Sequence, residues 1–401
     1  MIDIVAGLAW RDSLHDRRLF VCFAAAFAAV LAPLLVIYGL KFGIVDHLLG
    51  VLRDDPRNRE IVGIGNRNFD EAWFRRMAAR PDVAFVIPRT RALWATAFLD
   101  KPGAPAGRSV TAELIPTADG DPLLGPLAAQ ATDRAIVLSQ AAARRLDVRP
   151  GETLGLWAIR DSAAGRERVD LTVSVAAVAP AAAFVREGAF VSLALITAIE
   201  DWRDGRAVEA YGWAGEPHAG PRLYANYRLF SRTIFQVAGL EAALQREGLE
   251  VRTRSAEIES ILALDRNLSL VFFVVAGIAM AGYALSLAAS LWANVERKRR
   301  ELSVMRLIGV TRGAARVFPV VQGVLIAAAG LAGALALYGA AATVINRLYA
   351  SAYLEGAELC RLLPEHILVA GAGSLAIGAV ASLLASRRVV RIEPAEGLRD
   401  E

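Results

Sequence analysis

Four long runs without a charged side chain constrain the fold of this chain more than any other feature. An α-helix rises 1.5 Å per residue, so about 20 apolar residues cross the hydrocarbon core of a bilayer, which is about 30 Å thick. Backbone amides in that core find no water, and each must be paired within its own helix. We therefore predict four membrane-spanning helices, at residues 19–40, 267–295, 317–346 and 366–386.

The overall composition agrees with a membrane protein. Of the 401 residues, 55% are hydrophobic, and the mean hydropathy is +0.40. The first run exceeds the roughly 7 to 15 residues of a signal-peptide core, and acidic residues as well as Arg17 and Arg18 precede it. We expect it to be an uncleaved anchor.

Two pairs of small residues lie four positions apart within the predicted spans, Gly277 with Ala281 and Gly330 with Ala334. This spacing allows membrane helices to approach closely. Ordinary Ala/Gly-rich composition explains the pairs equally well.

The distribution of basic residues predicts the orientation of the spans, because cytoplasmic segments are enriched in Lys and Arg. The short loop 347–365 has only Arg347 and Arg361, so we place it outside the cytoplasm. Both termini and the stretch 296–316 are predicted to be cytoplasmic. Their basic residues are Arg11, Arg17 and Arg18; Arg297, Lys298, Arg299, Arg300, Arg306, Arg312 and Arg316; and Arg387, Arg388, Arg391 and Arg399.

The stretch VERKRRELSVMRLIGVTRGAARV, residues 295–317, also accounts for the basic isoelectric point of about 9.2. Its seven basic and two acidic residues leave a net charge of +5, against +4 for the whole chain. The excess charge therefore sets membrane topology and can contact anionic lipid, and we do not expect nucleic acid binding.

The segment between the first two spans has the pattern of an α/β domain. RAIVLSQAAARRLDVRPGETLGLWAI predicts a strand, a helix capped by Ser139, an Arg-Pro-Gly turn and a second strand. The predicted fold is thus a membrane protein with four transmembrane α-helices and a large extracytoplasmic α/β domain inserted between the first and second. The predicted segments are a cytoplasmic amphipathic segment 1–18, spans 19–41, 267–295, 317–346 and 366–386, an extracytoplasmic α/β domain 42–266, a cytoplasmic helix and loop 296–316, an extracytoplasmic loop 347–365 and a cytoplasmic tail 387–401.

Apolar residues recur at helical spacing at both ends of this domain. We predict that the first two spans continue outward as stalk helices; two unrelated surface helices are the alternative. The stalk candidates are Val45, Leu48, Leu49, Leu52, Ile258, Ile261 and Leu262, with Phe42 next to them.

Recognisable catalytic and cofactor motifs are absent from the sequence. A phosphate-binding Gly-Lys-Ser/Thr loop is excluded because none of the three lysines, Lys41, Lys101 and Lys298, follows a glycine. There is no HExxH, CxxC or GxSxG. Asp119 and Asp121 lie in a turn that we interpret as solvated rather than as a carboxylate pair.

The remaining side chains of metal and thiol chemistry are scattered. The four histidines, His15, His47, His218 and His366, fall in different regions, and no metal site is expected. Cys22 and Cys360 lie in different predicted segments, too far apart for a disulfide. We expect no enzyme activity and no cofactor in this chain.

The order of these segments resembles the FtsX-like permease family of ABC transporters, of the MacB and LolC/LolE type. The most specific part is RRELSVMRLIGVTRGAARV, which is similar to the family's Arg-Glu-hydrophobic-Gly-hydrophobic-Leu-Arg-Ala-Leu-Gly-Ala-Ser/Thr pattern. Glu301, Arg306 and Gly309 stand at matching positions, whereas Ser303 replaces the usual Gly. The tail RIEPAEGLRDE and the amino-terminal GLAWRDSLHDRRLF are also similar to the family's.

The resemblance implies a non-catalytic permease subunit in the bacterial inner membrane. ATP and Mg would be bound by a partner ABC ATPase, and a second permease copy or paralogue and a periplasmic adaptor are further implied partners. The stretch 296–316 would carry the coupling helix that docks on the ATPase, and a helix held on the lipid surface by its arginines is the alternative. The docking residues on this interpretation are Glu301, Leu302, Met305, Arg306, Ile308 and Gly309.

The function implied by the resemblance is mechanotransmission, in which nucleotide-driven movement of the ATPase is relayed to the outer domain for export or extraction of a hydrophobic substrate. A lipid, lipoprotein, peptide or drug would all fit. Two other classes stay open: an FtsX-like regulator of a periplasmic cell-wall hydrolase, and a membrane-anchored enzyme without a recognisable motif.

The predicted orientation can be tested with a membrane-impermeant thiol reagent. Cys360 should react from outside, unless its loop is buried against the outer domain, and a Thr311→Cys variant should not. Labelling of Thr311→Cys in intact cells would contradict the predicted topology.

Overall fold

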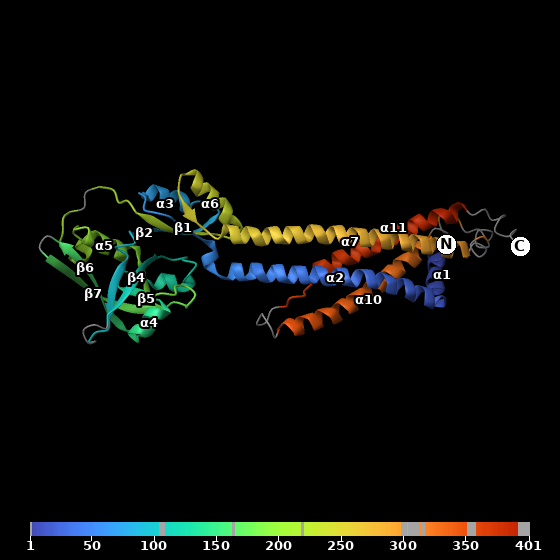
Figure 1. The fold of residues 1–401 in the computed structure, drawn as a ribbon, viewed down its shortest axis with the longest axis horizontal. Helices are drawn as coiled ribbons and strands as arrows, with labels where there is room; N and C mark the ends of the chain where they lie inside the picture. Colours follow the sequence, from blue (N-terminus) through green and yellow to red (C-terminus); the bar gives the residue numbers. More distant parts are fainter. Residues whose placement is uncertain are drawn as a thin grey trace. The chain divides into compact units, whose positions relative to one another are not determined.

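A computed structural model shows two compact units, a helical unit (residues 1–49 and 261–401) and an α/β unit (residues 50–260). Figure 1 colours the chain along its sequence. The residues that the structure describes are 2–103, 109–162, 165–217, 220–297, 303, 311, 313, 317–350 and 358–391.

Among its described residues the helical unit has five helices, of which two begin or end in the α/β unit. Four are long and apolar enough to cross a membrane, and each contains one of the predicted uncharged runs. The helices are α1 (Ile2–His15), α2 (Arg17–Asp54), α7 (Ser255–Arg297), α10 (Val317–Ala350) and α11 (Pro364–Arg391).

The four long helices share one apolar core, to which α2 contributes Phe27 and Leu31. A Cβ added at Gly330 of α10 would lie 2.6 Å from a ring carbon of Phe27, so this glycine permits the close approach of α10 to α2. Ala334 is fully buried, as its predicted pairing with Gly330 requires. A Cβ added at Gly277, by contrast, would have no atom of another helix within 4 Å, so this glycine does not form the predicted close contact within this chain.

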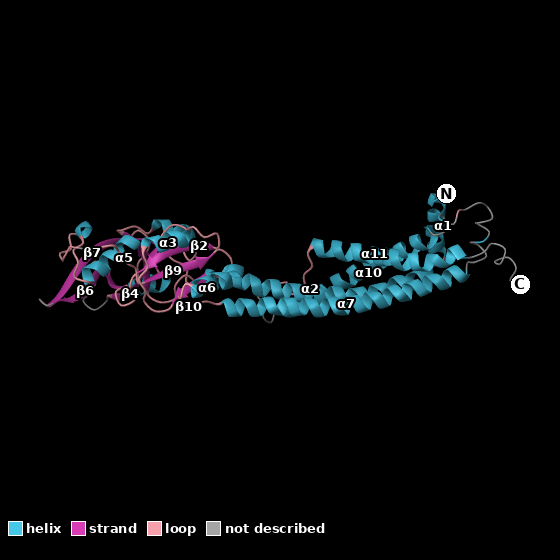
Figure 2. Ribbon diagram, turned by 90° about the horizontal axis from the view of Figure 1, so that it is seen from above, coloured by secondary structure: helices cyan, strands magenta, loops and turns pink. Residues whose placement is uncertain are grey.

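The α/β unit contains two sheets, shown as magenta strands in Figure 2. One is a four-stranded sheet in the order β10-β1-β9-β2, and the other is a closed barrel in the order β3-β4-β8-β5-β7-β6. In the barrel, β4 pairs with β8 and β5 with β7 in parallel, and the other pairs are antiparallel. The sheet strands are β1 (Glu60–Gly63), β2 (Val83–Arg89), β9 (Asn226–Ser231) and β10 (Val251–Arg252); the barrel strands are β3 (Thr96–Asp100), β4 (Val110–Thr117), β5 (Ala135–Leu138), β6 (Thr153–Ser162), β7 (Gly165–Val178) and β8 (Gly188–Ser192).

Four α-helices cover these sheets. In contact with the four-stranded sheet, α3 (Glu71–Ala78) lies on β2, and α6 (Val237–Arg246) lies on β1 and β10. On the barrel, α4 (Gln140–Leu146) contacts β4 and β8, and α5 (Leu193–Arg203) contacts β4, β6 and β8.

Side-chain caps start three of these helices. Ser139 Oγ accepts a hydrogen bond from the Ala142 amide at 3.2 Å, which confirms the predicted cap of α4. Asp70 caps α3 and Ser192 caps α5 in the same way. The Arg-Pro-Gly turn after α4 has Gly151 at a φ of 94°, a conformation that suits glycine. The predicted order of strand, capped helix, turn and strand is therefore confirmed over β5, α4 and β6.

The interpretation of Asp121 as part of a solvated turn is wrong. Asp121 is fully buried, and its carboxylate pairs with the Arg228 guanidinium of β9 at 2.6 Å. Arg228 also donates to the Pro116 carbonyl at 2.7 Å, and Thr117 Oγ1 donates to Asp121 at 2.8 Å. Asp119 of the same turn is exposed. The buried ion pair fastens the sheet to the end of barrel strand β4.

Burial also acts on a third ionisable group near this pair. Burial raises the pKa of the Glu60 carboxyl on β1, while the positive charges of Arg228 and Arg89 lower it. Arg228 lies among three aromatic rings, those of Phe85, Phe190 and Phe230, at 5.5–5.9 Å. In this otherwise apolar setting, the Asp121 carboxylate compensates the charge of Arg228.

We expect Asp121→Asn to destabilise the α/β unit by about 3–5 kcal/mol, because Arg228 would keep its charge and lose its partner. Urea unfolding of the full chain in detergent, followed by tryptophan fluorescence, measures this. Five of the seven tryptophans lie in the α/β unit. Asp119→Asn makes the same chemical change at an exposed position, and it should stay within about 0.5 kcal/mol of wild type. Equal unfolding midpoints for the two variants would contradict the assignment.

Candidate functional site

Helices α2 and α7 form an antiparallel pair in constant register. The Phe27 and Tyr283 rings are 4.4 Å apart, and the Tyr38 and Phe272 rings 4.9 Å. Further along, Lys41 Nζ donates a hydrogen bond to Ser269 Oγ at 2.7 Å. From the first of these pairs to the last, the α2 residue advances by as many positions as its α7 partner recedes. The two helices therefore contact each other without a slip over this length.

The predicted stalk residues are at least partly buried: Leu48, Leu49, Ile261 and Leu262 are half-buried. Leu52 is 9% exposed and Ile258 is 2% exposed. Val45 is likewise buried. All the stalk candidates lie in the same unbroken helices as the predicted spans, because α2 ends at Asp54 and α7 begins at Ser255. Their role in transmitting movement stays a prediction.

An ion pair joins α2 to α7 near the middle of this register. Lys41 Nζ lies 2.6 Å from Asp265 Oδ1, and the Lys41 side chain is only 12% exposed. The positions of the two residues in the sequence are compatible with this pairing, because Lys41 directly follows the uncharged run 19–40 and Asp265 lies two residues before the run 267–295.

An apolar cavity of about 310 Å³ lies among α2, α7 and α11. Leu35, Phe272 and Met280 line it, and its few polar side chains include Tyr38 and His366. The His366 ring packs edge-on against the Tyr38 ring at 5.1 Å. The mostly apolar lining suits an apolar ligand group.

A buried polar network joins α1, α7 and α10. Gln322 Nε2 donates to Asp12 Oδ2 at 2.8 Å, and Asn294 Nδ2 donates to Gln322 Oε1 at 3.3 Å. Gln322 and Asn294 are 5% and 8% exposed. Buried amides in an apolar bundle fix the relative position of the helices that carry them, since an unpaired amide there is costly. Asn294 is near the end of α7, and Gln322 is near the start of α10. The network therefore joins the two helix ends between which residues 298–316 run.

The residues predicted to dock on an ATPase lie outside the described residues. Between Arg297 of α7 and Val317 of α10 the structure describes only residues 303, 311 and 313, none of which is among the docking residues. The docking role therefore stays a prediction for Glu301, Leu302, Met305, Arg306, Ile308 and Gly309.

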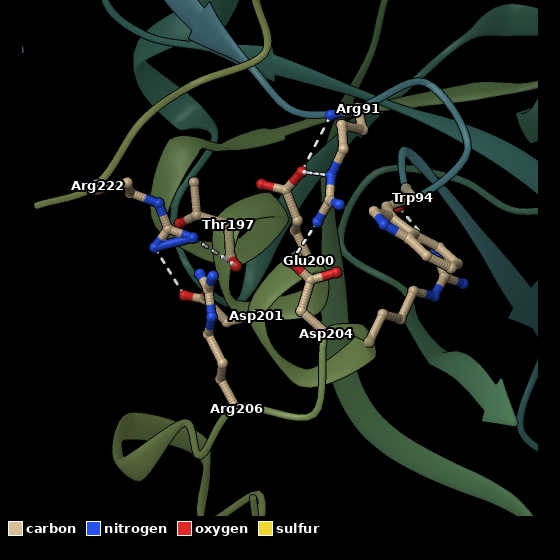
Figure 3. Close-up of polar contacts among 9 residues, drawn as sticks. Arg91, Trp94, Thr197, Glu200, Asp201, Asp204, Arg206 and Arg222 are labelled. Atoms are coloured by element: carbon tan, nitrogen blue, oxygen red, sulfur yellow. Dashed lines mark hydrogen bonds and ion pairs between the residues drawn. The ribbon is translucent and has the colours of Figure 1, made fainter. Parts of the chain in front are cut away.

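In the α/β unit, charged side chains gather at the end of α5 (Figure 3). Glu200 Oε1 accepts hydrogen bonds from the backbone and side chain of Arg91, both at 3.1 Å, and Asp204 also pairs with Arg91. Asp201 pairs with Arg222 at 2.6 Å and with Arg206 at 3.2 Å. Arginines from three separate segments are thus held on one helix.

This cluster has the properties of a structural clasp. Each of its three carboxylates already has an arginine partner. Arg203 has no carboxylate partner among the contacts described and donates to the carbonyls of Trp94 and Ile159, at 2.7 and 3.3 Å. Burial lowers the pKa of the Arg203 guanidinium. Within the described part of the chain, no group of three or more His, Cys, Asp or Glu side chains could hold a metal ion.

The structure shows that the thiol of Cys360 is buried. Cys360 is 3% exposed, and its thiol lies 4.0 Å from the Tyr338 hydroxyl and 3.9 Å from the Val36 carbonyl. It is therefore buried against α2 and α10, in the helical unit, and we no longer expect rapid labelling from outside. Thr311→Cys remains usable as a topology reporter.

Comparison with known families gives a match to part of the helical unit. Residues 273–394 match the family model of the FtsX-like permease C-terminal domain. A comparison with curated proteins found no match. The chain therefore carries an FtsX-like permease C-terminal domain that includes most of α7, all of α10 and α11, and the stretch 298–316.

This match and the four long apolar helices indicate a membrane-embedded protein with an ABC transporter permease-type or FtsX-like role. Subunits of this family are generally non-catalytic and normally work with an ABC ATPase. The matched segment does not include the α/β unit, so the MacB or LolC/LolE type stays a prediction.

Proposed function

We propose that this chain is the permease subunit of an ABC transporter and that it works by mechanotransmission. A partner ATPase binds ATP and Mg and docks on residues 296–316. Its movement passes through the helices to the α/β unit, which acts on a hydrophobic substrate such as a lipid, lipoprotein, peptide or drug. The observation that carries the proposal is the α2/α7 pair, which keeps one register and continues past the apolar core.

A helix transmits displacement while its backbone hydrogen bonds are unbroken. Two antiparallel helices bend less than one, because bending the pair requires the packed side chains to slide past each other. The contacts Phe27 with Tyr283 and Tyr38 with Phe272, and the Lys41–Asp265 ion pair, oppose such sliding. The pair therefore has the properties of a lever.

The network of Asp12, Gln322 and Asn294 supports the entry of force at the other end. It connects α7 with α10, the two helices that bound 298–316. A push on that stretch would therefore act on both helices together. In the same proposal the chain lies in the bacterial inner membrane with both termini in the cytoplasm, beside a second permease copy or paralogue and with a periplasmic adaptor.

The alternative is an FtsX-like regulator that activates a periplasmic cell-wall hydrolase without transport. The family match favours it as much as transport, since the match is to the FtsX-like C-terminal domain. Both functions would use the same lever. Copurification of a hydrolase favours regulation, whereas copurification of an adaptor favours export.

The docking assignment predicts that Met305→Asp weakens ATPase binding by orders of magnitude. A carboxylate buried without a counter-ion costs several kcal/mol, and each 1.4 kcal/mol is about a tenfold change in affinity. A pull-down of the ATPase from membranes measures this, with equal membrane insertion as the check. Leu93→Asp introduces the same charge at an exposed position of the α/β unit, outside the docking stretch, and should keep the ATPase. Binding of the ATPase to Met305→Asp at wild-type levels would contradict the assignment.

The lever itself predicts loss of function when both helices are interrupted. About six Gly/Ser residues inserted after Gly50, with a matching insertion after Leu264, replace stiff helix by flexible chain. We expect membrane insertion and ATPase binding to persist and export, or hydrolase activation, to be lost. The same insertion after Gly103, in an exposed turn, should leave all of these intact. Undiminished output from the doubly interrupted protein would point to a conduit among the spans instead.

A further inference from the structure

The connection between α10 and α11 ends in a segment that lies against α2. This segment, residues 358–363, is called the strap here. A Cβ added at Gly43 of α2 would lie 2.0 Å from the Leu359 carbonyl oxygen and 3.0 Å from that of Glu358. A clash with backbone is not relieved by a side-chain rotation. The strap can therefore reach this position only because residue 43 is glycine.

A second glycine, one helical turn earlier, completes the contact. The Arg361 amide donates a hydrogen bond to the Gly39 carbonyl at 3.2 Å. A Cβ at Gly39 would lie 3.3 Å from Cys360 Sγ and 3.0 Å from the Tyr338 ring. Gly39 and Gly43 thus form a shallow seat on α2 for the strap.

On its other side the strap is held by α10. Asn346 Nδ2 donates to the Cys360 carbonyl at 3.1 Å, and the Cys360 amide donates to Asn346 Oδ1 at 2.8 Å. One side-chain amide therefore satisfies both backbone groups of Cys360. Each bond contributes to stability and each group would be costly to leave unpaired, so this double contact fixes the strap's backbone on α10.

At the start of α11, His366 extends the contact with α2. Its ring packs against Phe42 at 4.7 Å and Tyr38 at 5.1 Å, and its Nδ1 accepts a hydrogen bond from the Leu363 amide at 3.3 Å. In the same part of α2, Lys41 pairs with Asp265 of α7. Contacts within a few residues of Lys41 therefore join α2 to each of the other three long helices.

We propose that the strap is a permanent brace that fixes the α10–α11 pair to α2, and that Gly39, Gly43 and Asn346 are its positioning residues. This inference rests on the proposed function and adds to it the place where force from α10 and α11 enters the lever. Without the brace, movement of α10 would be shared with α2 only through apolar contacts. With it, α2 follows α10 and α11 as one body.

The buried thiol of Cys360 reports directly whether the strap is seated. Burial raises the pKa of this thiol, so a reagent that attacks the thiolate reacts slowly while the strap is in place. In a Cys22→Ser background, which leaves Cys360 as the single cysteine, reaction with a small maleimide in nanodiscs measures opening of the strap.

Gly43→Ala should increase the labelling rate of Cys360 by about tenfold or more, because the added Cβ cannot share space with the strap backbone. Gly50→Ala is the matched control on the same helix, since nothing lies within 4 Å of its Cβ. It should label at the wild-type rate. Asn346→Ala removes the two hydrogen bonds without touching α2 and should also speed labelling, which keeps the test decisive if Gly43→Ala does not fold. Labelling of Gly43→Ala and Asn346→Ala at the same rate as Gly50→Ala would overturn the proposal.

The role as a brace is tested by the response of the complex to ATP. The readout is the change in hydrogen exchange of residues 45–58 when ATP binds the copurified complex. We expect wild type to show this change and Gly43→Ala and Asn346→Ala to lose it. An undiminished change in a variant whose Cys360 labels faster than wild type would overturn the proposal, because the seated strap would then not be needed to pass on the movement.

The two ideas fail in different ways. A wild-type complex in which ATP causes no change at residues 45–58 would contradict the proposed mechanotransmission. The labelling comparison needs neither ATPase nor substrate, and it would still decide whether Gly43 and Asn346 seat the strap.

Discussion

Backbone amides inside a bilayer must be paired within their own helix, and the rest of this structure depends on that constraint. It makes α2 and α7 unbroken through their apolar parts, and both then continue beyond them without a change of structure. Pro33 removes one backbone hydrogen bond within α2. The register with α7 is nevertheless the same on either side of it, as the pairs Phe27 with Tyr283 and Tyr38 with Phe272 show. The proline therefore leaves the pairing intact.

Lipid gives apolar helices no hydrophobic reason to associate, so close packing has to hold them together. Glycine is the means at three contacts. Gly330 admits Phe27 of α2; at Gly378 of α11 a Cβ would lie 2.8 Å from the Gly323 carbonyl of α10; and Gly43 admits the strap. In each case an added methyl group would meet backbone or a ring held by its neighbours. The helical unit is thus specified more by where side chains are missing than by which large ones are present.

Features that depend on short stretches of chain could be predicted from the sequence, and those that depend on distant partners could not. The uncharged runs and the Ser139 cap each follow from a few neighbouring residues, and the helices and the cap are present. Burial of Asp121 was missed because its partner Arg228 is 107 positions away and no local pattern connects them. The seat of the strap was missed for the same reason: Gly39 and Gly43 are four apart on α2, but the backbone that they admit belongs to a segment more than 300 positions later.

The polar contacts between helices that the structure describes in the helical unit are concentrated at two levels, and this has a mechanical consequence. One level is the network of Asp12, Gln322 and Asn294 near the 298–316 stretch, and the other comprises Lys41 with Asp265 and the strap. Between them the helices meet through apolar side chains. Apolar packing resists separation but is not directional, whereas hydrogen bonds fix both distance and orientation. Helices held by hydrogen bonds at two levels, with only apolar packing between these levels, are expected to tilt together rather than slide individually. A tilt of the whole bundle is also the motion that a continuous α2/α7 pair can transmit over the longest distance.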